Sequence, residues 1–288
     1  MTSPPRRNDR KRRPDLSAGG GSGRDERRPE RPAEPQRERA QRTPRPDADA
    51  WVWGWHPVLA ALANPRREPS RLLVAPDRAR ELEGRLGARA GRLRAEPTDP
   101  ADIARQLPAG VAHQGVALRA APPPASNLDA LAAGGGLLVL LDQVTDPQNV
   151  GAVFRSAAAF GAVGVVLQDR NTPALGGVVA KASAGAVDAV PHARVVNLSR
   201  ALEQLADAGW RAVGLDGAAE ATLEAVLDAR PTVLVLGSEG QGLRRLVAEH
   251  CDALARIPMP GGFESLNVSA AAAVALYEAA RARSGADA

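Results

Sequence analysis

Apolar runs recur at regular intervals along the second half of the chain, beginning with LLVLLD at 137–142. The predicted strands are 137–142, 163–169, 211–217, 232–237 and 254–259, and the predicted helices are 148–160, 174–185, 199–208, 242–250 and 266–283. Continuous apolar strands are typical of a parallel sheet that is buried on both faces. Strands alternating with helices predict an open, mostly parallel α/β sheet. Ligands bind such sheets at the carboxyl ends of the strands. The loops after Leu141, Leu236 and Ile257 are therefore the expected positions of a site.

A shorter α/β alternation precedes this region. In VWGWHPVLAAL, at 52–62, a strand turns through Gly54, and Pro57 stands near the start of a helix, where its missing N–H costs little. Strands are predicted at 71–75, 92–96 and 113–120, and helices at 77–90 and 99–107. A segment rich in Pro and then Gly follows at 121–136 and is typical of a linker. The pattern predicts a small domain over 51–120, a linker over 121–136 and a larger domain over 137–284.

Residues 1–50 lack the apolar side chains needed to form a core, with Leu16 as their only large aliphatic residue, and are expected to be a disordered tail. They hold 14 Lys or Arg and 9 Asp or Glu, a formal charge of +5, whereas the other 238 residues hold 23 and 24, a charge of −1. The basic excess of the chain thus lies in the tail. The tail is either a solubilising segment or a salt-sensitive contact for RNA.

The composition leads us to expect a cytoplasmic protein. No apolar run reaches the length of a membrane span, and no apolar stretch follows the charged N-terminus as in a signal peptide. The single cysteine, Cys251, cannot form an internal disulfide and is expected to be a small core residue. The four histidines show no metal-binding spacing, so no metal site is predicted.

The first polar loop, DPQNVGAVFRS at 146–156, begins with the turn signal Asp146-Pro147. Asn149 stands near the start of the predicted helix and Arg155 follows six residues later. On an ideal helix these side chains are about 120° apart, so they converge only if Asn149 precedes the helix proper. A capping Asn and a solvent-facing Arg are the alternative interpretation.

The second polar loop, GSEGQG at 237–242, follows a buried strand. Glycines here allow a backbone to approach a ligand closely. Glu239 occupies the turn and would repel a diphosphate, which argues against NAD or ATP and favours a cationic or hydroxyl-bearing ligand.

The third polar loop lies in RIPMPGGFESLNVSAAAA, at 256–273. Ser265, Asn267 and Ser269 cluster at the start of an alanine-rich helix. They serve either as helix caps or as part of a site.

Together the three loops carry a family resemblance. DPQNVGAVFRSAAAFG, LVLGSEGQGL and IPMPGGFESLNVSAAAAVALYE resemble, in order and spacing, the three motifs of the SPOUT-class RNA 2′-O-methyltransferases of the TrmH family. The match covers 137–283. VWGWHPVLAAL and HQGVALRA are similar to the start and end of the small L30e-like RNA-binding domain found in many members. The layout is most similar to the members that methylate a guanosine ribose of 23S rRNA.

The resemblance implies a deep C-terminal trefoil knot, which connection rules do not anticipate. It also implies a homodimer with sites at the interface, and S-adenosylmethionine bound by the backbone around Gly237, Ile257 and Leu266. By the same resemblance, the polar active-site positions are Asn149, Arg155, Glu239, Ser265 and Asn267.

The implied reaction is methyl transfer to a ribose 2′-hydroxyl. Arg155 is the family's proposed base or activator, but a guanidinium rarely releases its proton. We therefore expect Arg155 to hold the phosphate beside the target ribose and to stabilise the developing alkoxide, while Glu239 or a water takes the proton. A tRNA ribose as the substrate, an RNA-binding protein without activity and a nucleotide-dependent α/β enzyme remain as alternatives.

Overall fold

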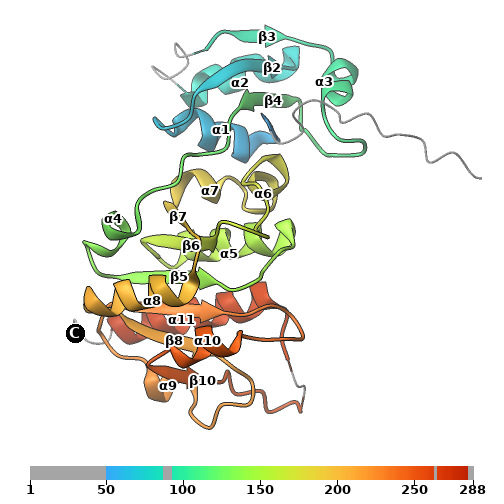
Figure 1. Ribbon diagram of the computed structural model, residues 1–288. Helices are drawn as coiled ribbons and strands as arrows, with labels where there is room; N and C mark the ends of the chain where they lie inside the picture. Colours follow the sequence, from blue (N-terminus) through green and yellow to red (C-terminus); the bar gives the residue numbers. More distant parts are fainter. Residues whose placement is uncertain (1–49, 87–92, 263–264, 285–288) are drawn as a thin grey trace, which may run out of the picture. The chain divides into compact units, whose positions relative to one another are not determined.

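The computed structural model describes residues 50–86, 93–262 and 265–284, and within these ranges the strands form two sheets (Figure 1). The strands are β1 Trp51–Trp53, β2 Pro69–Val74, β3 Ala95–Pro97, β4 Val116–Ala120, β5 Leu137–Leu141, β6 Gly164–Gln168, β7 His192–Val195, β8 Arg211–Leu215, β9 Thr232–Leu236 and β10 Ala253–Ala255. The helices are α1 Trp55–Ala63, α2 Pro76–Leu86, α3 Pro100–Gln106, α4 Leu128–Ala132, α5 Pro147–Ala159, α6 Gly177–Ala182, α7 Ala186–Ala189, α8 Leu198–Asp207, α9 Leu223–Val226, α10 Arg245–Glu249 and α11 Val268–Ser284. Residues 1–49 of the expected tail, 1–50, and part of the expected helix 77–90 lie outside the described residues.

The first sheet has four strands in the order β1-β4-β2-β3. β4 pairs antiparallel with β1 and β2, and β3 pairs parallel with β2. The strand expected over 113–120 begins at Val116, because Gln114 and Gly115 have φ of 56° and 78° and turn the chain before it. Helix α3 begins where the side chain of Asp99 accepts from the backbone N–H of Ala101, as a helix cap does.

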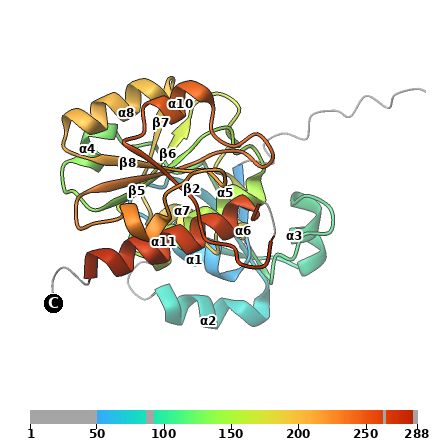
Figure 2. The same cartoon turned by 90° about the horizontal axis from the view of Figure 1, so that it is seen from below.

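The second sheet confirms the predicted α/β fold with a mostly parallel sheet. Its order is β10-β8-β9-β5-β6-β7, and every pair is parallel. Successive residues of the central strand β5 face opposite sides. Val139 packs in one core with α5, α6, α7 and α11, whereas Leu138 and Leu140 pack in another with α4, α8 and α10. The views in Figures 1 and 2 show these helices in two layers with the strands between them.

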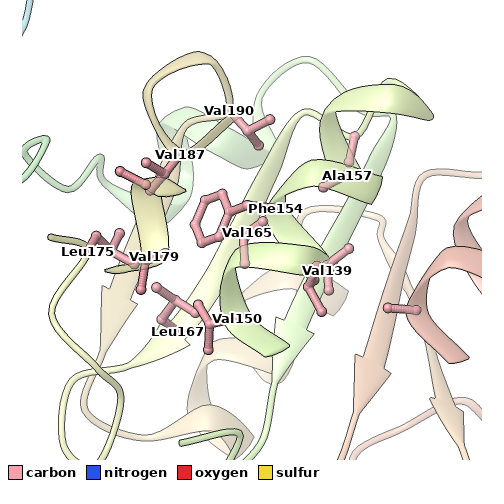
Figure 3. Packing of buried hydrophobic residues seen from close by; sticks show 14 of the residues in the cluster. Val139, Val150, Phe154, Ala157, Val165, Leu167, Leu175, Val179, Val187 and Val190 are labelled. Atoms are coloured by element: carbon pink, nitrogen blue, oxygen red, sulfur yellow. The ribbon is translucent and has the colours of Figure 1, made fainter. Parts of the chain in front are cut away.

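The larger core is centred on Phe154 of α5, which is fully buried. Figure 3 shows its ring between Val165 of the sheet and Val179 and Val187 of α6 and α7. The α5 helix therefore lies between the sheet and the α6–α7 pair, which fixes the start of α5 close to the carboxyl ends of the strands.

Some elements differ from the prediction. β7 was not expected, because Val195 is the only large apolar or β-branched residue among the four of HARV. The expected linker contains α4, whose first turn is capped by the side chain of Asn127. The strand expected over 254–259 is only β10, since Pro258 and Pro260 lack the N–H that a strand needs. The helix expected over 174–185 is confined to α6, and Gly185, which has a φ of 92°, separates it from α7.

The two sheets are joined at a surface that we call the junction, formed by β1, α1 and the loop to Arg67 on one side and by α6 and α7 on the other. A Cβ at Gly177 would lie 2.0 Å from the ring of Trp53, so only glycine fits there. Arg67 and Asp188, both with fully buried side chains, form a two-point ion pair with Nε–Oδ1 and Nη2–Oδ2 distances of 2.7 and 3.0 Å. The amide of Asn64 donates to the same carboxylate.

Candidate active site at the carboxyl ends of the strands

A cavity of about 460 Å³ lies at the carboxyl ends of β8, β9 and β10. Three segments line it, drawn from residues 215–217, 236–242 and 255–271. The volume is in the range of sites for small molecules and cofactors. The loops after Leu236 and Ile257 therefore line a pocket, as their positions predicted. The loop after β8 also contributes, with Asp216, which sequence reasoning missed although a polar residue directly follows that strand.

A polar cluster stands at one side of this pocket. Oε1 of Glu239 accepts from the amides of Asn149 and Asn267, at 3.1 and 2.5 Å, and from the backbone N–H of Val268 at 3.3 Å. The amide of Asn267 also donates to Oδ1 of Asn149 at 3.0 Å. The structure thus brings three of the predicted polar residues together from three separate segments, the first turn of α5, the loop after β9 and the residue before α11. In the described part of the chain, Oε2 of Glu239 has no hydrogen-bond partner.

Helix starts position two members of this cluster. Asp146 caps α5 by accepting from the backbone N–H of Asn149, and Pro147 occupies the first helical position. Asn267 precedes α11 and accepts from the backbone N–H groups of Ser269 and Ala270. Asn149 is therefore fixed in the first turn of α5 and Asn267 directly before α11, and Glu239 reaches both from the loop after β9.

Asn149 lies inside α5, as its third residue, and not in the preceding loop. The condition for Asn149 and Arg155 to converge is therefore not met, because both residues belong to the same helix. Arg155 is exposed, and among the described residues no group forms a hydrogen bond or ion pair with its guanidinium. Within one chain, the structure does not bring Arg155 into the polar cluster.

The remaining predicted residues line the pocket. Ser265, Leu266 and Ile257 are on its wall, Leu266 with 40% of its surface exposed. Gly237 is also on the wall, but its lack of a side chain serves the loop itself: a Cβ there would lie 2.1 Å from the backbone of Gly242. Close approach of the loop's two ends thus requires glycine at position 237, and close approach of a ligand there stays a prediction.

The chemistry of the pocket favours a ligand with apolar and neutral polar parts. Among the residues described, the charged side chains on its wall are those of Asp216 and Glu239, and no Lys or Arg lines it. A polyphosphate would need cations or a helix N-terminus aimed at it. An adenosine held by backbone groups, with a sulfonium near a carboxylate, fits this donor set.

Other candidate chemistry finds no support in the described residues. Burial raises the pKa of the Cys251 thiol to about 12, and its Sγ donates to the carbonyl of Val247. A thiolate is the reactive form, so this cysteine is a packing residue. No described helix is long and apolar enough to cross a membrane.

Comparisons with known proteins agree with this geometry. The model of the SpoU rRNA Methylase family matches residues 136–277, and the model for RNA 2′-O ribose methyltransferase substrate binding matches residues 51–126. The chain is 41% identical to the 23S rRNA (guanosine-2′-O-)-methyltransferase RlmB of Xylella fastidiosa, over 81% of this chain and 96% of that protein.

Two further relatives extend the comparison. An uncharacterized tRNA/rRNA methyltransferase of Mycolicibacterium gilvum is 46% identical over 63% of this chain, a match that spans 60% of its own length. The SpoU methyltransferase AviRb of Streptomyces viridochromogenes, solved with AdoMet, is 28% identical with a TM-score of 0.69, over 81% of this chain and 89% of that one. The chain therefore belongs to the SpoU rRNA methylase family, which confirms the resemblance carried by its three motifs.

Proposed function

We propose that this protein transfers a methyl group from S-adenosylmethionine to a ribose 2′-hydroxyl of RNA, and that the target is a guanosine of 23S rRNA. The observation that carries the proposal is the Asn149–Glu239–Asn267 cluster at the side of a pocket whose described lining is mainly apolar and includes no Lys or Arg. The AdoMet-bound relative AviRb and the rRNA-modifying relative RlmB support the donor and the acceptor. Ribosomal RNA as the substrate would place the protein in the cytoplasm.

The donor brings its own activation, because the sulfonium makes the methyl group electrophilic. The protein must then align the ribose hydroxyl with the methyl group and accept a proton. Gly237, Ile257 and Leu266 stand on the pocket wall and would hold the donor, with Ser265 beside them. Oε1 of Glu239 is fixed by three donors, so the second oxygen, Oε2, is the one that can accept the hydroxyl proton.

Arg155 takes part in this proposal through a second copy of the chain. It is exposed on α5, and α5 packs against α11. On α11, Val274 and Tyr277 are 43% and 55% exposed, and the ring of Tyr277 contacts Phe160, which ends α5. We infer a homodimer through this face, with Arg155 of one copy serving the pocket of the other as a clamp for the phosphate beside the target ribose.

Mixed dimers test this arrangement. Arg155→Ala and Glu239→Ala are each expected to be inactive alone. After the two variants are mixed and reassociated, about a quarter of the wild-type activity is expected, because half of the dimers are mixed and each carries one complete site. No recovery, with mixed dimers verified by mass spectrometry, would place both residues in one chain's site. Arg155→Lys should keep some activity if the side chain supplies only a positive charge.

We also propose the remaining features that the resemblance implies. They are the trefoil knot in the C-terminal part, an L30e-like RNA-binding domain over 51–120 and a linker over 121–136 ahead of the catalytic domain at 137–284. The tail, 1–50, would add salt-dependent RNA affinity. Deletion of the tail should then lower the affinity for rRNA and reduce its dependence on salt, and an unchanged salt slope would exclude such a contribution.

The first experiment follows labelled methyl from S-adenosylmethionine into unmodified 23S rRNA and, separately, into total tRNA. Label on one guanosine ribose of 23S rRNA, lost in Arg155→Ala, is the expected result. Label on tRNA instead would keep the chemistry and change the substrate; the name of the M. gilvum relative makes this the second candidate. No label on either RNA would leave an RNA-binding protein without activity.

A further inference from the structure

We call the cavity at the carboxyl ends of β8, β9 and β10 the donor pocket. A second hollow, which we call the polar hollow, lies beside it. It has a volume of about 500 Å³ and is lined by Gln143, Thr145, Asn171 and Ser238. These residues follow three neighbouring strands, β5, β6 and β9, at their carboxyl ends. The hollow therefore belongs to the same edge of the sheet at which ligands bind in this class of fold.

The lining of the polar hollow is neutral and unpaired. It consists of two amides and two hydroxyls, and none of these four side chains forms a hydrogen bond with another of the residues described. A phosphate would call for cations, and a metal ion would call for carboxylates or imidazoles. Amides and hydroxyls instead recognise the edges of unstacked bases, to which they can both donate and accept.

The position of the polar hollow relates it to the methyl-transfer site. Ser238 lines both the hollow and the donor pocket, and the next residue, Glu239, belongs to the polar cluster. Along the sheet edge, the donor pocket lies over β10, β8 and β9, and the hollow lies over β9, β5 and β6. The carboxylate that can accept the hydroxyl proton thus stands where the two cavities meet.

The backbone holds the amides of the hollow in place. Gln143 and Asn171 have φ of 58° and 64°, a region that residues other than glycine seldom occupy and that is found often at functional sites. Just before Gln143, the fully buried carboxylate of Asp142 accepts from Nε of Arg244 at 2.7 Å, and Nη2 of Arg244 donates to Gln168 at the end of β6. The ends of both strands are therefore joined by one guanidinium.

We propose that the polar hollow binds the unstacked base of the nucleotide that is methylated, with Gln143 and Asn171 contacting the base edge. The ribose of that nucleotide then lies toward Ser238, between the base and the donor pocket, with its 2′-hydroxyl next to Glu239. This inference rests on the proposed function, because it names the acceptor subsite of the same reaction. It makes Gln143 and Asn171 the residues that select the target base.

Glycine substitutions test the hollow without disturbing its backbone. Gln143→Gly and Asn171→Gly remove the amides, and glycine adopts both positive φ values without strain. The matched control is Ala184→Gly, which makes the same kind of change at a φ of 52° outside the hollow. Binding of S-adenosylmethionine is measured first by calorimetry and should be unchanged in all three variants.

Methyl transfer is then measured on an rRNA fragment that contains the mapped target, and on the same fragment with the target base removed but its ribose intact. Each hollow variant should lower kcat/KM on the intact fragment roughly tenfold, the size of one good base contact. Ala184→Gly should leave it unchanged. On the abasic fragment the wild type should be less active than on the intact fragment. The hollow variants should be about as active on the abasic fragment as the wild type is on it.

The outcomes separate the two proposals. Suppose that a hollow variant lowers kcat/KM by the same factor, relative to wild type, on intact and on abasic RNA. That result would show that the polar hollow is not the base site, while the methyltransferase function stands. Full activity of Gln143→Gly and Asn171→Gly on the intact fragment would do the same. A wild-type protein that binds S-adenosylmethionine but methylates no RNA would overturn the proposed function, and the acceptor subsite with it.

Discussion

Polar side chains differ in burial and in pairing between the junction and the carboxyl ends of the six-stranded sheet. At the junction, the side chains of Arg67 and Asp188 are fully buried and form an ion pair with each other. At the strand ends, Gln143 and Asn171 are exposed and unpaired among the described residues. The difference indicates that the junction holds two parts of the molecule in one arrangement, whereas the strand ends keep hydrogen-bonding capacity for a ligand. Substitutions should therefore affect stability in one region and turnover in the other.

The largest expected effect is at the junction. Asp188→Ala leaves the guanidinium of Arg67 buried without its partner, and such a change costs about 3–5 kcal/mol of unfolding free energy. Urea denaturation measures it. The control is the double substitution Arg67→Leu with Asp188→Leu, which removes both charges and should recover most of the loss. A single-variant cost below about 1 kcal/mol would show that the pair is solvated.

Glu239→Gln, in contrast, should lower turnover and leave the unfolding free energy nearly unchanged. It keeps the shape of the side chain and removes the charge that accepts a proton, so kcat for methyl transfer should fall about a hundredfold or more. The unfolding free energy should change by less than about 0.5 kcal/mol, as for an exposed position. Glu249→Gln, at an exposed carboxylate paired with Arg245, is the control and should alter neither quantity. Turnover within threefold of wild type would remove Glu239 from the chemistry.

The sequence predicted these two regions unequally. The parallel sheet could be predicted because runs such as LLVLL can be buried only between two layers of helices. The strand ends could be predicted as the site because the fold class fixes where ligands bind. The meeting of Asn149 with Glu239 came from family resemblance, and the position of Arg155 was tied to a helix start that periodicity places only approximately.

The contacts at the junction could not be predicted from the sequence. Arg67 and Asp188 are separated by 121 positions, and nothing local marks either residue as buried or names its partner. The same holds for Gly177, because its position near the start of a predicted helix does not indicate that the ring of Trp53 packs against it. Long-range packing of this kind depends on how two separately formed elements meet, and periodicity carries no information about that.

Gly177→Ala should lower the unfolding free energy, as Asp188→Ala does, but by a smaller amount. The added methyl group would meet the ring of Trp53 at 2.0 Å and the carbonyl of Trp51 at 2.2 Å, so β1 and α6 must separate. Overpacking of this kind costs about 1–3 kcal/mol. Gly134→Ala is the matched control, since nothing lies within 4 Å of the added atom. Equal unfolding free energies for the two variants would show that the junction yields easily.

The smallest expected effect is the change in unfolding free energy with pH that comes from His192. His192 is 3% exposed, and burial, together with the nearby charges of Arg194, Arg66 and Arg67, lowers its pKa from 6.5 to about 4. The unfolded chain therefore binds a proton at a higher pH than the folded one does. The stability that comes from keeping His192 neutral is complete above pH 6.5 and is lost as the pH falls from 6.5 to 4.

At pH 5.5, about one unit below the unfolded pKa, the loss amounts to about 1.4 kcal/mol. Urea denaturation at pH 7.5 and pH 5.5 measures it, and His192→Gln should abolish that part of the difference while keeping a polar side chain. His250 is a useful contrast, because hydrogen bonds to the Leu246 carbonyl and to Glu203 raise its pKa. Its contribution is therefore fully present at low pH and decreases as the pH rises. If His192→Gln loses as much stability as wild type over this range, other titrating groups cause the pH dependence.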